Sequence, residues 1–570
     1  MREREKSSTM ERKSLSTMER GTLGLRDRLL KHTLLKRETL NPKTWLNSEP
    51  VKGFTDLILQ RDNTEPDTSY DNEAMLLESE KEYIEAAKRN DIEAMKLNGR
   101  GVNVNAKNLH HRTALHYAVA FRNVEAVEVI LKRRAKLELR DKHGITAIHL
   151  AAWFGSLDIL KLLVQAGADQ AVETKEGMNM MHCAAINNHT DIMGYIIDDL
   201  QMKELDKRDQ HGNWPFAVAA EHGSVRMLQM LMEDPYNMAT TEANENGQTP
   251  LHLAAKNGQV EAVHLLLDNF DIRDEVNKVG ETALYLAADG AHEECVEALL
   301  EAGCDPNIAN NVKSSPLHPV CEKGHTSLAK ILIENGAQMN AQNQHMEVPM
   351  HLAVKNCHIP IIHTLLESGC DPNITDHMGQ TALHIAAELG KVDVVEMILK
   401  ADLDLELKDR QGKTALGVAA RADAVIIVDM IIKAERYFHW RRTNAVTNEI
   451  LHNELPLTFK VDHRADTTQI RDTIWNLAYK YFKCNDWKRL AEHWGFTKLQ
   501  MDAIEEQWTG PQSYQEHGNR MLLIWLHGII STQRSAIKEL YEGLLSIGNK
   551  KVAEKIRMEA EDSTKKCTIS

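Results

Sequence analysis

The sequence predicts an all-α protein: a long solenoid of paired helices followed by a small helical bundle. Three observations lead to this fold class. A short motif returns at a nearly fixed interval through the middle of the chain, and the apolar residues between its copies have helical spacing. The interval then disappears after Trp440, where a different helical pattern begins. A period kept over so much of a chain indicates an array of similar structural units.

The repeat is clearest at the residue that stands three places before a recurring histidine. These residues follow one another in steps of 33 residues, with two steps of 35. They are Thr113, Thr146, Asn179, Trp214, Thr249, Thr282, Ser315, Val348, Thr381 and Thr414. The recurring histidines are His116, His149, His182, His252, His318, His351 and His384. A period of this length is typical of a unit that forms one helix pair.

One unit, GQTPLHLAAKNGQVEAVHLLLDN, shows how the helices are specified. The hydroxyl of Thr249 can cap a first helix, and Pro250 suits its first position because the missing N–H would have no partner there anyway. Apolar residues at helical spacing predict a short helix before Gly258 and a second, more apolar helix after it. One pair cannot bury its apolar side alone, so we expect neighbouring pairs to stack into a solenoid.

The recurring histidines have two interpretations, a dispersed metal or catalytic site and a part of the scaffold. Metal ligands must converge on one point at about 2 Å. Equivalent residues of stacked repeats, in contrast, are separated by roughly 8–10 Å. In three units the histidine is also replaced, by Ala217, Tyr285 and Gly417. We therefore expect the histidines to belong to the scaffold.

The phrase T-P-L-H-x-A at this period, as in Thr249 to Ala254, resembles the ankyrin repeat over roughly residues 80–440. The resemblance implies an ankyrin-repeat solenoid of about 11 helix-pair repeats including caps. It also implies that each histidine hydrogen-bonds a neighbouring turn, and that proteins bind the hairpin fingers and the concave inner helices. EKEYIEAAKRNDIEAM fits a polar first capping unit, and GKTALGVAARADAVIIVDMIIKA fits a last one.

Four apolar residues near the ends of the first helices are candidate partner-binding residues: Phe121, Trp153, Phe154 and Ile186. They fall at corresponding places in consecutive repeats, so we expect an apolar stripe on the inner face, where aromatic anchors could bind a protein. The alternative is that these side chains fold under adjacent loops or the N-terminal region. The two 35-residue steps add residues around MKELDKRDQ and EDPYNMATTEANE, which we expect to form surface loops that could contact a partner.

After an aperiodic segment, IRDTIWNLAYKYF begins a new helical series whose tryptophans we expect in a core: Trp475, Trp487, Trp494, Trp508 and Trp525. The order of DWKRLAEHWGFTKLQMDAIEEQW, RMLLIWLHGII, IKELYEGLLSIG and NKKVAEKI resembles a death domain. The resemblance implies a six-helix bundle that binds other death domains through charged and polar surfaces. Lys488 and Glu505 are among the candidate surface charges. The implied core contains Trp487, Leu490, Ile504, Leu523 and Trp525.

Composition restricts the function classes. The net charge of −15 argues against nucleic-acid binding, which needs a basic surface over the phosphates. No cysteines form a C-x-x-C pair and the N-terminus lacks the apolar core of a signal peptide, so we expect a cytoplasmic protein. The longest aliphatic run, AVIIVDMII, is too short to span a membrane and contains Asp429. Without a phosphate-binding loop, nucleophile elbow or kinase motif, we expect no enzyme activity and no cofactor.

The predicted parts are a disordered N-terminal region, the array, a linker, the death domain and a tail, at residues 1–75, 76–440, 441–466, 467–558 and 559–570. The chain ends in Cys567-Thr568-Ile569-Ser570, which fits the C-a-a-X pattern for prenylation of Cys567; the alternative is a frayed tail that ends this way by chance. The predicted function is a non-catalytic adaptor in intracellular signalling, whose array binds one protein and whose death domain binds others. The alternative is a scaffold tethered to a membrane by the prenylated Cys567.

Overall fold

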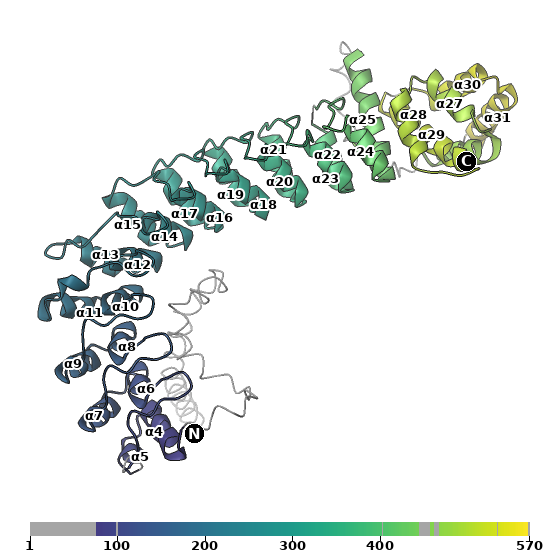
Figure 1. Cartoon of the computed structure of the whole chain (residues 1–570). Helices are drawn as coiled ribbons and strands as arrows, with labels where there is room; N and C mark the ends of the chain where they lie inside the picture. Colours follow the sequence, from purple (N-terminus) through teal and green to yellow (C-terminus); the bar gives the residue numbers. More distant parts are fainter. Residues whose placement is uncertain are drawn as a thin grey trace, which may run out of the picture. The chain divides into compact units, whose positions relative to one another are not determined.

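The computed structural model describes residues 76–97, 101–401, 403–443, 457–460, 467–532 and 534–567, with side chains up to residue 558. In these ranges every element is a helix, apart from one isolated β-bridge between Lys408 and Thr414. The chain divides into an N-terminal unit that ends at Cys304 and a C-terminal unit that begins at Asp305. The predicted all-α fold class is confirmed (Figure 1).

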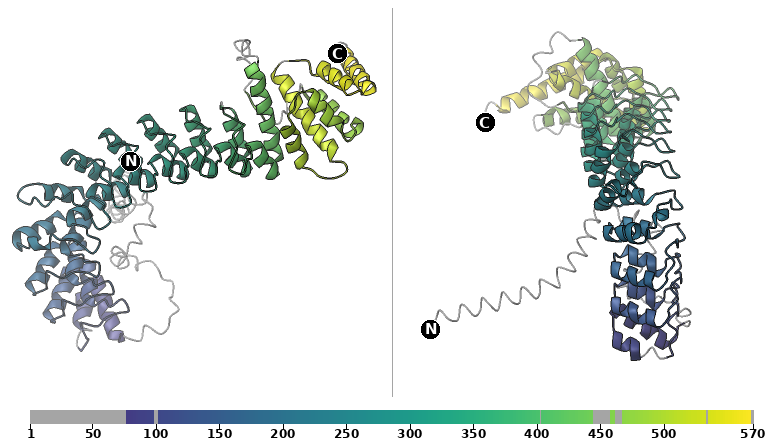
Figure 2. Two further views of the ribbon diagram at one scale, coloured as in Figure 1. Left: turned by 45° about the horizontal axis from the view of Figure 1, so that its top comes forward. Right: turned by 90° about the vertical axis from the view of Figure 1, so that its left-hand side faces the viewer.

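The N-terminal unit is a stack of helix pairs, and the first helix of each pair packs against the first helix of the next (Figure 2). The first helices are α4 (Glu78–Arg89), α6 (Ala114–Ala120), α8 (Ala147–Trp153), α10 (Met180–Ile186), α12 (Pro215–Glu221), α14 (Pro250–Lys256) and α16 (Ala283–Asp289). The second helices are α5 (Ile92–Leu97), α7 (Val124–Lys132), α9 (Leu157–Gln165), α11 (Thr190–Gly194), α13 (Val225–Met232), α15 (Val260–Asn269) and α17 (Glu293–Glu301). A π-helical turn, η2 (Tyr195–Asp199), and a 3-10 turn, η3 (Lys203–Leu205), extend α11.

The C-terminal unit is a stack of helix pairs followed by a bundle. Its pairs are α18 (Leu317–Lys323) with α19 (Thr326–Glu334), α20 (Pro349–Lys355) with α21 (Ile359–Glu367), α22 (Ala382–Glu388) with α23 (Val392–Leu399), and α24 (Ala415–Arg421) with α25 (Val425–Thr443). The bundle contains α26 (Thr468–Asn476), its π-helical extension η6 (Leu477–Tyr481), α27 (Asp486–His493), α28 (Lys498–Glu506), α29 (Ser513–Ser531), α30 (Ala536–Ser546) and α31 (Lys550–Cys567).

The starts of α10, α14, α16, α22 and α24 follow the capping logic of the sequence, because the N-cap side chain of each accepts an amide of the first turn. Helix α14 begins at Pro250, and Thr249 is its N-cap, with the Thr249 hydroxyl oxygen accepting a hydrogen bond from the His252 N–H. The Thr282 hydroxyl does the same for the Tyr285 N–H at 3.1 Å. Because a side-chain oxygen satisfies one of the free amides of the first turn, these helices start at a defined residue. The predicted cap is confirmed.

The loop between consecutive repeats forms a finger that projects from the helix stack. In the finger before α8, a carboxylate oxygen of Asp141 accepts hydrogen bonds from the amides of His143 (2.8 Å) and Ile145 (2.9 Å). The amide of Lys142 donates to the carbonyl of His110, the tip of the preceding finger, at 3.1 Å. Fingers are therefore tied both internally and to their neighbours, so the tips keep a fixed spacing.

Glycine at the finger turn has a steric reason. Gly144 has a φ of +79°, and a Cβ there would lie 2.8 Å from the backbone nitrogen of Lys175 in the next finger. Gly212 has the same φ, and its Cβ would lie 2.7 Å from the nitrogen of Glu245. Both the positive φ and the close backbone approach favour glycine.

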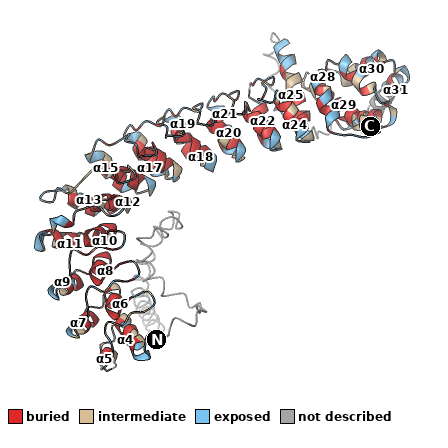
Figure 3. Cartoon of the chain, viewed as in Figure 1, coloured by how far each residue is buried: buried red, intermediate tan, exposed pale blue. Residues whose placement is uncertain are grey.

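The core runs along the stack between the helices. Figure 3 shows the buried positions on the facing sides of the helices in each unit, while exposed positions lie outward. Buried alanines such as Ala151 and Ala254, both fully inaccessible, let consecutive first helices approach closely. Each pair therefore shares its apolar side with its neighbours, as a solenoid requires.

Candidate functional site

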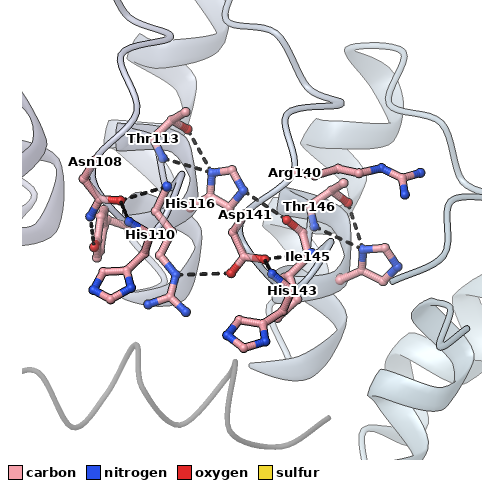
Figure 4. A network of polar contacts seen from close by, with 12 residues as sticks. Asn108, His110, Thr113, His116, Arg140, Asp141, His143, Ile145 and Thr146 are labelled. Carbon is pink, nitrogen blue, oxygen red and sulfur yellow. Dashed lines mark hydrogen bonds and ion pairs between the residues drawn. The ribbon is translucent and has the colours of Figure 1, made fainter. Parts of the chain in front are cut away.

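The recurring histidine is part of a local hydrogen-bond network (Figure 4). The backbone amide of Thr113 donates to Nδ1 of His116 at 3.2 Å, and Nε2 of the same ring lies 3.2 Å from the carbonyl oxygen of Ile145. An amide can only donate and a carbonyl can only accept, so Nδ1 carries no proton and Nε2 does. The ring is therefore neutral and links its own helix to the next finger.

The same arrangement recurs along the array. The Nε2 atoms of His182, His252, His318 and His384 donate at 3.1–3.2 Å to the carbonyls of Asn213, Glu281, Glu347 and Lys413, each in the following finger. His149 donates to the carbonyl of Val172 instead. Each ring thus has its own acceptor, and the rings do not converge. The predicted hydrogen bond to a neighbouring turn is confirmed in these repeats.

Burial controls the charge of these rings. Desolvation lowers the pKa of His116 and of His149 to about 4, although nearby carbonyls and Asp141 act in the opposite direction. Burial also lowers the pKa of His182, His252, His318, His351 and His384. The neutral ring that the hydrogen bonds require is therefore the form present near neutral pH. Within the described ranges, no three His, Cys, Asp or Glu side chains lie close enough to hold a metal ion.

A buried ion pair accompanies the first of these networks. The guanidinium Nε of Arg112 lies 3.2 Å from a carboxylate oxygen of Asp141, and both side chains are 1% exposed. Asp141 also accepts the two amides of its own finger, so one carboxylate holds two consecutive fingers together (Figure 4). Such a pair fixes the relative position of its neighbours because breaking it would leave a buried charge unpaired.

Of the four residues expected to form an exposed apolar stripe, two are buried and two are partly exposed. Trp153 and Ile186, the last residues of α8 and α10, are 6% and 2% exposed, so they contribute to the core rather than to an open surface. They pack there because α8 contacts both α6 and α10, and α10 contacts both α8 and α12. Phe121 and Phe154 follow the helix ends as C-cap residues and are partly exposed. The exposure expected for Trp153 and Ile186 is therefore wrong, and partner binding at Phe121 and Phe154 stays a prediction.

The two predicted insertions meet on one surface of the N-terminal unit. Lys203 of the first insertion lines an open hollow of about 430 Å³ together with residues of η2 and with Pro235 and Tyr236 of the second insertion, and the Tyr236 hydroxyl donates to a carboxylate oxygen of Asp198 in η2 at 2.8 Å. Burial raises the pKa of Asp206, which also belongs to the first insertion, to about 6. The sequence predicted two separate loops, and the structure shows that they share a surface.

A set of finger residues in the C-terminal unit was not anticipated. Val312 and Met378 occupy the tip position of the first and third of three consecutive fingers, and Met346 directly follows the tip residue, His345, of the finger between them. The three apolar side chains are 48%, 40% and 43% exposed, respectively. We call these three residues the fingertip stripe. The equivalent tips of the first four fingers carry His110, His143, Glu176 and His211. Comparing the tip position between repeats would have found Val312 and Met378 from the sequence, whereas Met346 stands one place later, where other fingers have Gly144 and Gly212.

The bundle core agrees with the expectation at four of five residues. Trp487, Leu490, Ile504 and Trp525 are at most 2% exposed. The indole of Trp525 stacks on that of Trp494 at 4.2 Å between ring centroids. Leu523 is partly exposed, so its assignment to the core is wrong. Its neighbours Leu522 and Ile524 are buried instead, because Leu523 lies on a side of α29 that the other helices cover less.

Two tryptophans expected in the core lie on the bundle surface. Trp475 and Trp508 are 49% and 52% exposed, and the Trp475 ring stacks on Tyr479 at 4.9 Å between centroids. Of the predicted surface charges, Lys488 and Glu505 form an exposed ion pair at 2.6 Å. Exposed aromatic rings beside charged residues are typical of surfaces that bind proteins.

Some predictions fall outside the described residues. These are the disordered region 1–75 and the side chain of Cys567 with the three residues after it. Prenylation of Cys567 therefore stays a prediction. Among the helices that the structure describes, none combines the length and apolar character that crossing a bilayer demands.

Comparison with protein families gives two matches. The model described as ankyrin repeats (3 copies) matches residues 83–174, 218–310, 303–376 and 350–439, which together cover more than half of the chain. The model described as a death domain matches residues 474–560, where the bundle lies. The stretch between the first two ankyrin matches contains α10, α11 and the first insertion. The chain therefore belongs to the ankyrin-repeat proteins and carries a C-terminal death domain.

Proposed function

We propose that the protein is a non-catalytic adaptor in intracellular signalling, in which the ankyrin array binds one protein and the death domain assembles with other death domains. The observation that carries this proposal is the presence of both interaction modules in one chain. The buried recurring histidines support it too, because they are engaged in scaffold hydrogen bonds and are neutral near pH 7. The cysteines of the described part are free, which favours a reducing, cytoplasmic location.

Two parts of the array are the candidate contact surfaces. The fingertip stripe places exposed apolar side chains at or directly beside the tips of three fingers, where burial in a protein interface would be favourable. Phe121 and Phe154 lie at the ends of two inner helices, as the concave-face prediction requires. On the death domain, Trp475 with Tyr479 is the corresponding exposed aromatic pair.

Proximity labelling of the full chain in cells would test the two-partner arrangement. One variant carries Val312→Ser, Met346→Ser and Met378→Ser, and a second carries Trp475→Ala. A His211→Ser variant serves as the control, since it changes a fingertip that is already polar. We expect the first two variants to lose different sets of neighbours, with death-domain proteins only in the set lost by the second. Loss of one common set, or no death-domain protein in either set, would contradict the proposal.

A lipid on Cys567 would tether the same adaptor to a membrane. This second candidate is supported by the last four residues and by Lys565 and Lys566 before them, a combination that binds membranes reversibly. The intact mass of the protein isolated from cells tests it, with a Cys567→Ser chain as the control. A mass that equals that of the unmodified chain would remove this candidate.

A further inference from the structure

The last helix of the ankyrin array is unlike the end of a solenoid. A terminal repeat needs a polar outer side, because nothing stacks on it. Helix α25 has 19 residues and buries apolar side chains on more than one side, among them Ile427, Met430, Ile431 and Phe438. A helix that is apolar around its circumference is covered on several faces. Here α28 and α29 of the death domain supply the outer cover.

A buried ion pair joins α25 to the death domain. Nε and Nη2 of Arg520 in α29 lie 3.0 and 2.6 Å from a carboxylate oxygen of Asp429 in α25. The Arg520 side chain is 3% exposed and that of Asp429 is 20% exposed. Burial raises the pKa of Asp429, and the charge of Arg520 opposes that shift. Two charges so poorly hydrated are stable only while they face each other, so the pair penalises any separation of the two domains.

A short segment between the two domains, residues 457–460, contacts both of them, and we call it the strap. Phe459 is fully buried, and the centroid of its ring lies 5.8 to 6.2 Å from the ring centroids of Tyr437, Phe438 and His527. Its amide donates to the carboxylate of Glu396 in α23, at 3.0 Å to the nearer oxygen. The strap therefore touches both the array and the bundle.

The strap also forms hydrogen bonds with both domains. Nε2 of His527 in α29 donates to the carbonyl of Thr458 at 2.7 Å. On the array side, Nζ of Lys433 donates to the carbonyls of Phe459 and Lys460 at 3.2 and 3.3 Å. A strap held by α25 and α29 together can stay in place only while the two helices remain adjacent.

A second set of polar groups joins α25 to α28 and to the loop before it. Nη2 of Arg436 in α25 donates to the Trp494 carbonyl at 3.1 Å, and its guanidinium lies 3.9 Å from the centroid of the Phe496 ring. Nε2 of Gln500 in α28 donates to the Glu435 carboxylate at 2.7 Å. The contact therefore extends from the loop after α27 across α28 to α29, and it combines buried apolar side chains with buried polar groups that are paired across it.

We infer that the last ankyrin repeat is an intramolecular partner of the death domain: α25 and the strap cover the α28–α29 face, and a protein that binds this face must first open the contact. The cost of opening lies mainly in the Asp429–Arg520 pair and in exposing Phe459. The consequence for recruitment rests on the proposed adaptor function, whereas the closed contact can be tested without any partner.

The test uses the full chain with one protease site introduced between Thr447 and Asn448, cut after purification. We expect the two fragments to elute together in gel filtration at about 1 μM, as fragments with a Kd below about 1 μM would. Asp429→Arg should weaken their association at least about 100-fold, since it places two cations in the buried site. Combining it with Arg520→Asp should restore part of the affinity.

Two further variants separate loss of the contact from loss of folding. Phe459→Ser changes only the strap and should weaken the association without altering the near-ultraviolet signal of the stacked Trp494 and Trp525. Lys488→Glu changes an exposed ion pair inside the death domain and should leave the association unchanged. Separation of the unmodified fragments, or undiminished association in both Asp429→Arg and Phe459→Ser, would overturn the inference. Neither result depends on whether a death-domain partner exists.

Discussion

The buried histidines predict that acid destabilises the array in a specific pH window. The pKa of His116 is about 4 in the folded protein, against about 6.5 for an ordinary histidine in the unfolded chain. Because the folded pKa is the lower one, the unfolded state takes up the proton first. The histidine's contribution is fully present above pH 6.5 and is lost as the pH falls toward 4. At pH 5 the loss is about 2 kcal/mol for each such ring.

Other groups act in the opposite direction, so a matched variant is needed. Burial raises the pKa of Asp206 to about 6 and that of Glu435 to about 7, and each of these carboxyls therefore stabilises the fold as the pH falls from 7 to 5. His116→Gln removes one titrating ring and leaves these groups in place. The unfolding free energy of the variant should therefore fall less than that of the unmodified chain between pH 7 and pH 5, by about 2 kcal/mol.

Hydrogen exchange along a urea gradient, followed by mass spectrometry, measures this difference for α6 and α8 separately from the rest of the chain. A local measurement is required because a long repeat array and a second domain do not unfold in one step. If His116→Gln and the unmodified chain lost the same unfolding free energy in α6 over this pH range, the neutral, buried ring would not be the source of acid sensitivity.

Three further predictions concern the free energy of unfolding, measured from the urea midpoint of the domain or repeat that contains each substitution. Gly212→Ala should cost about 1–3 kcal/mol more than Gly412→Ala, because both have positive φ but only the first Cβ meets the next finger; equal costs would contradict this. Leu490→Ala should destabilise the death domain by about 2–5 kcal/mol, and a change below about 1 kcal/mol would mean that the site is not packed. Arg112→Met should cost about 3–5 kcal/mol and the exposed Lys488→Met at most about 1 kcal/mol; a reversed order would refute the role of burial.

The sequence predicted the parts of the fold that depend on local signals. The capping residue before Pro250, the glycine turns and the histidine bond to the next finger are all determined within one repeat and its neighbour, so they recur with the period. Exposure is a different matter, because helical spacing tells which residues are apolar but not what covers them. Trp153 was expected on an exposed surface and is buried by adjacent helices. Leu523 was expected in the core and is partly exposed on α29.

Asp429 shows why the contact between the array and the death domain could not be predicted. In the sequence it is a single charge inside an aliphatic run, and its only evident meaning is that the run does not cross a membrane. Its partner, Arg520, is 91 residues further along, and no periodic pattern links the two positions. A buried charge needs an opposite charge within a few ångströms, so Asp429 implied a missing partner without identifying it. An isolated carboxylate in the apolar face of a terminal repeat is therefore a signal that another domain docks there.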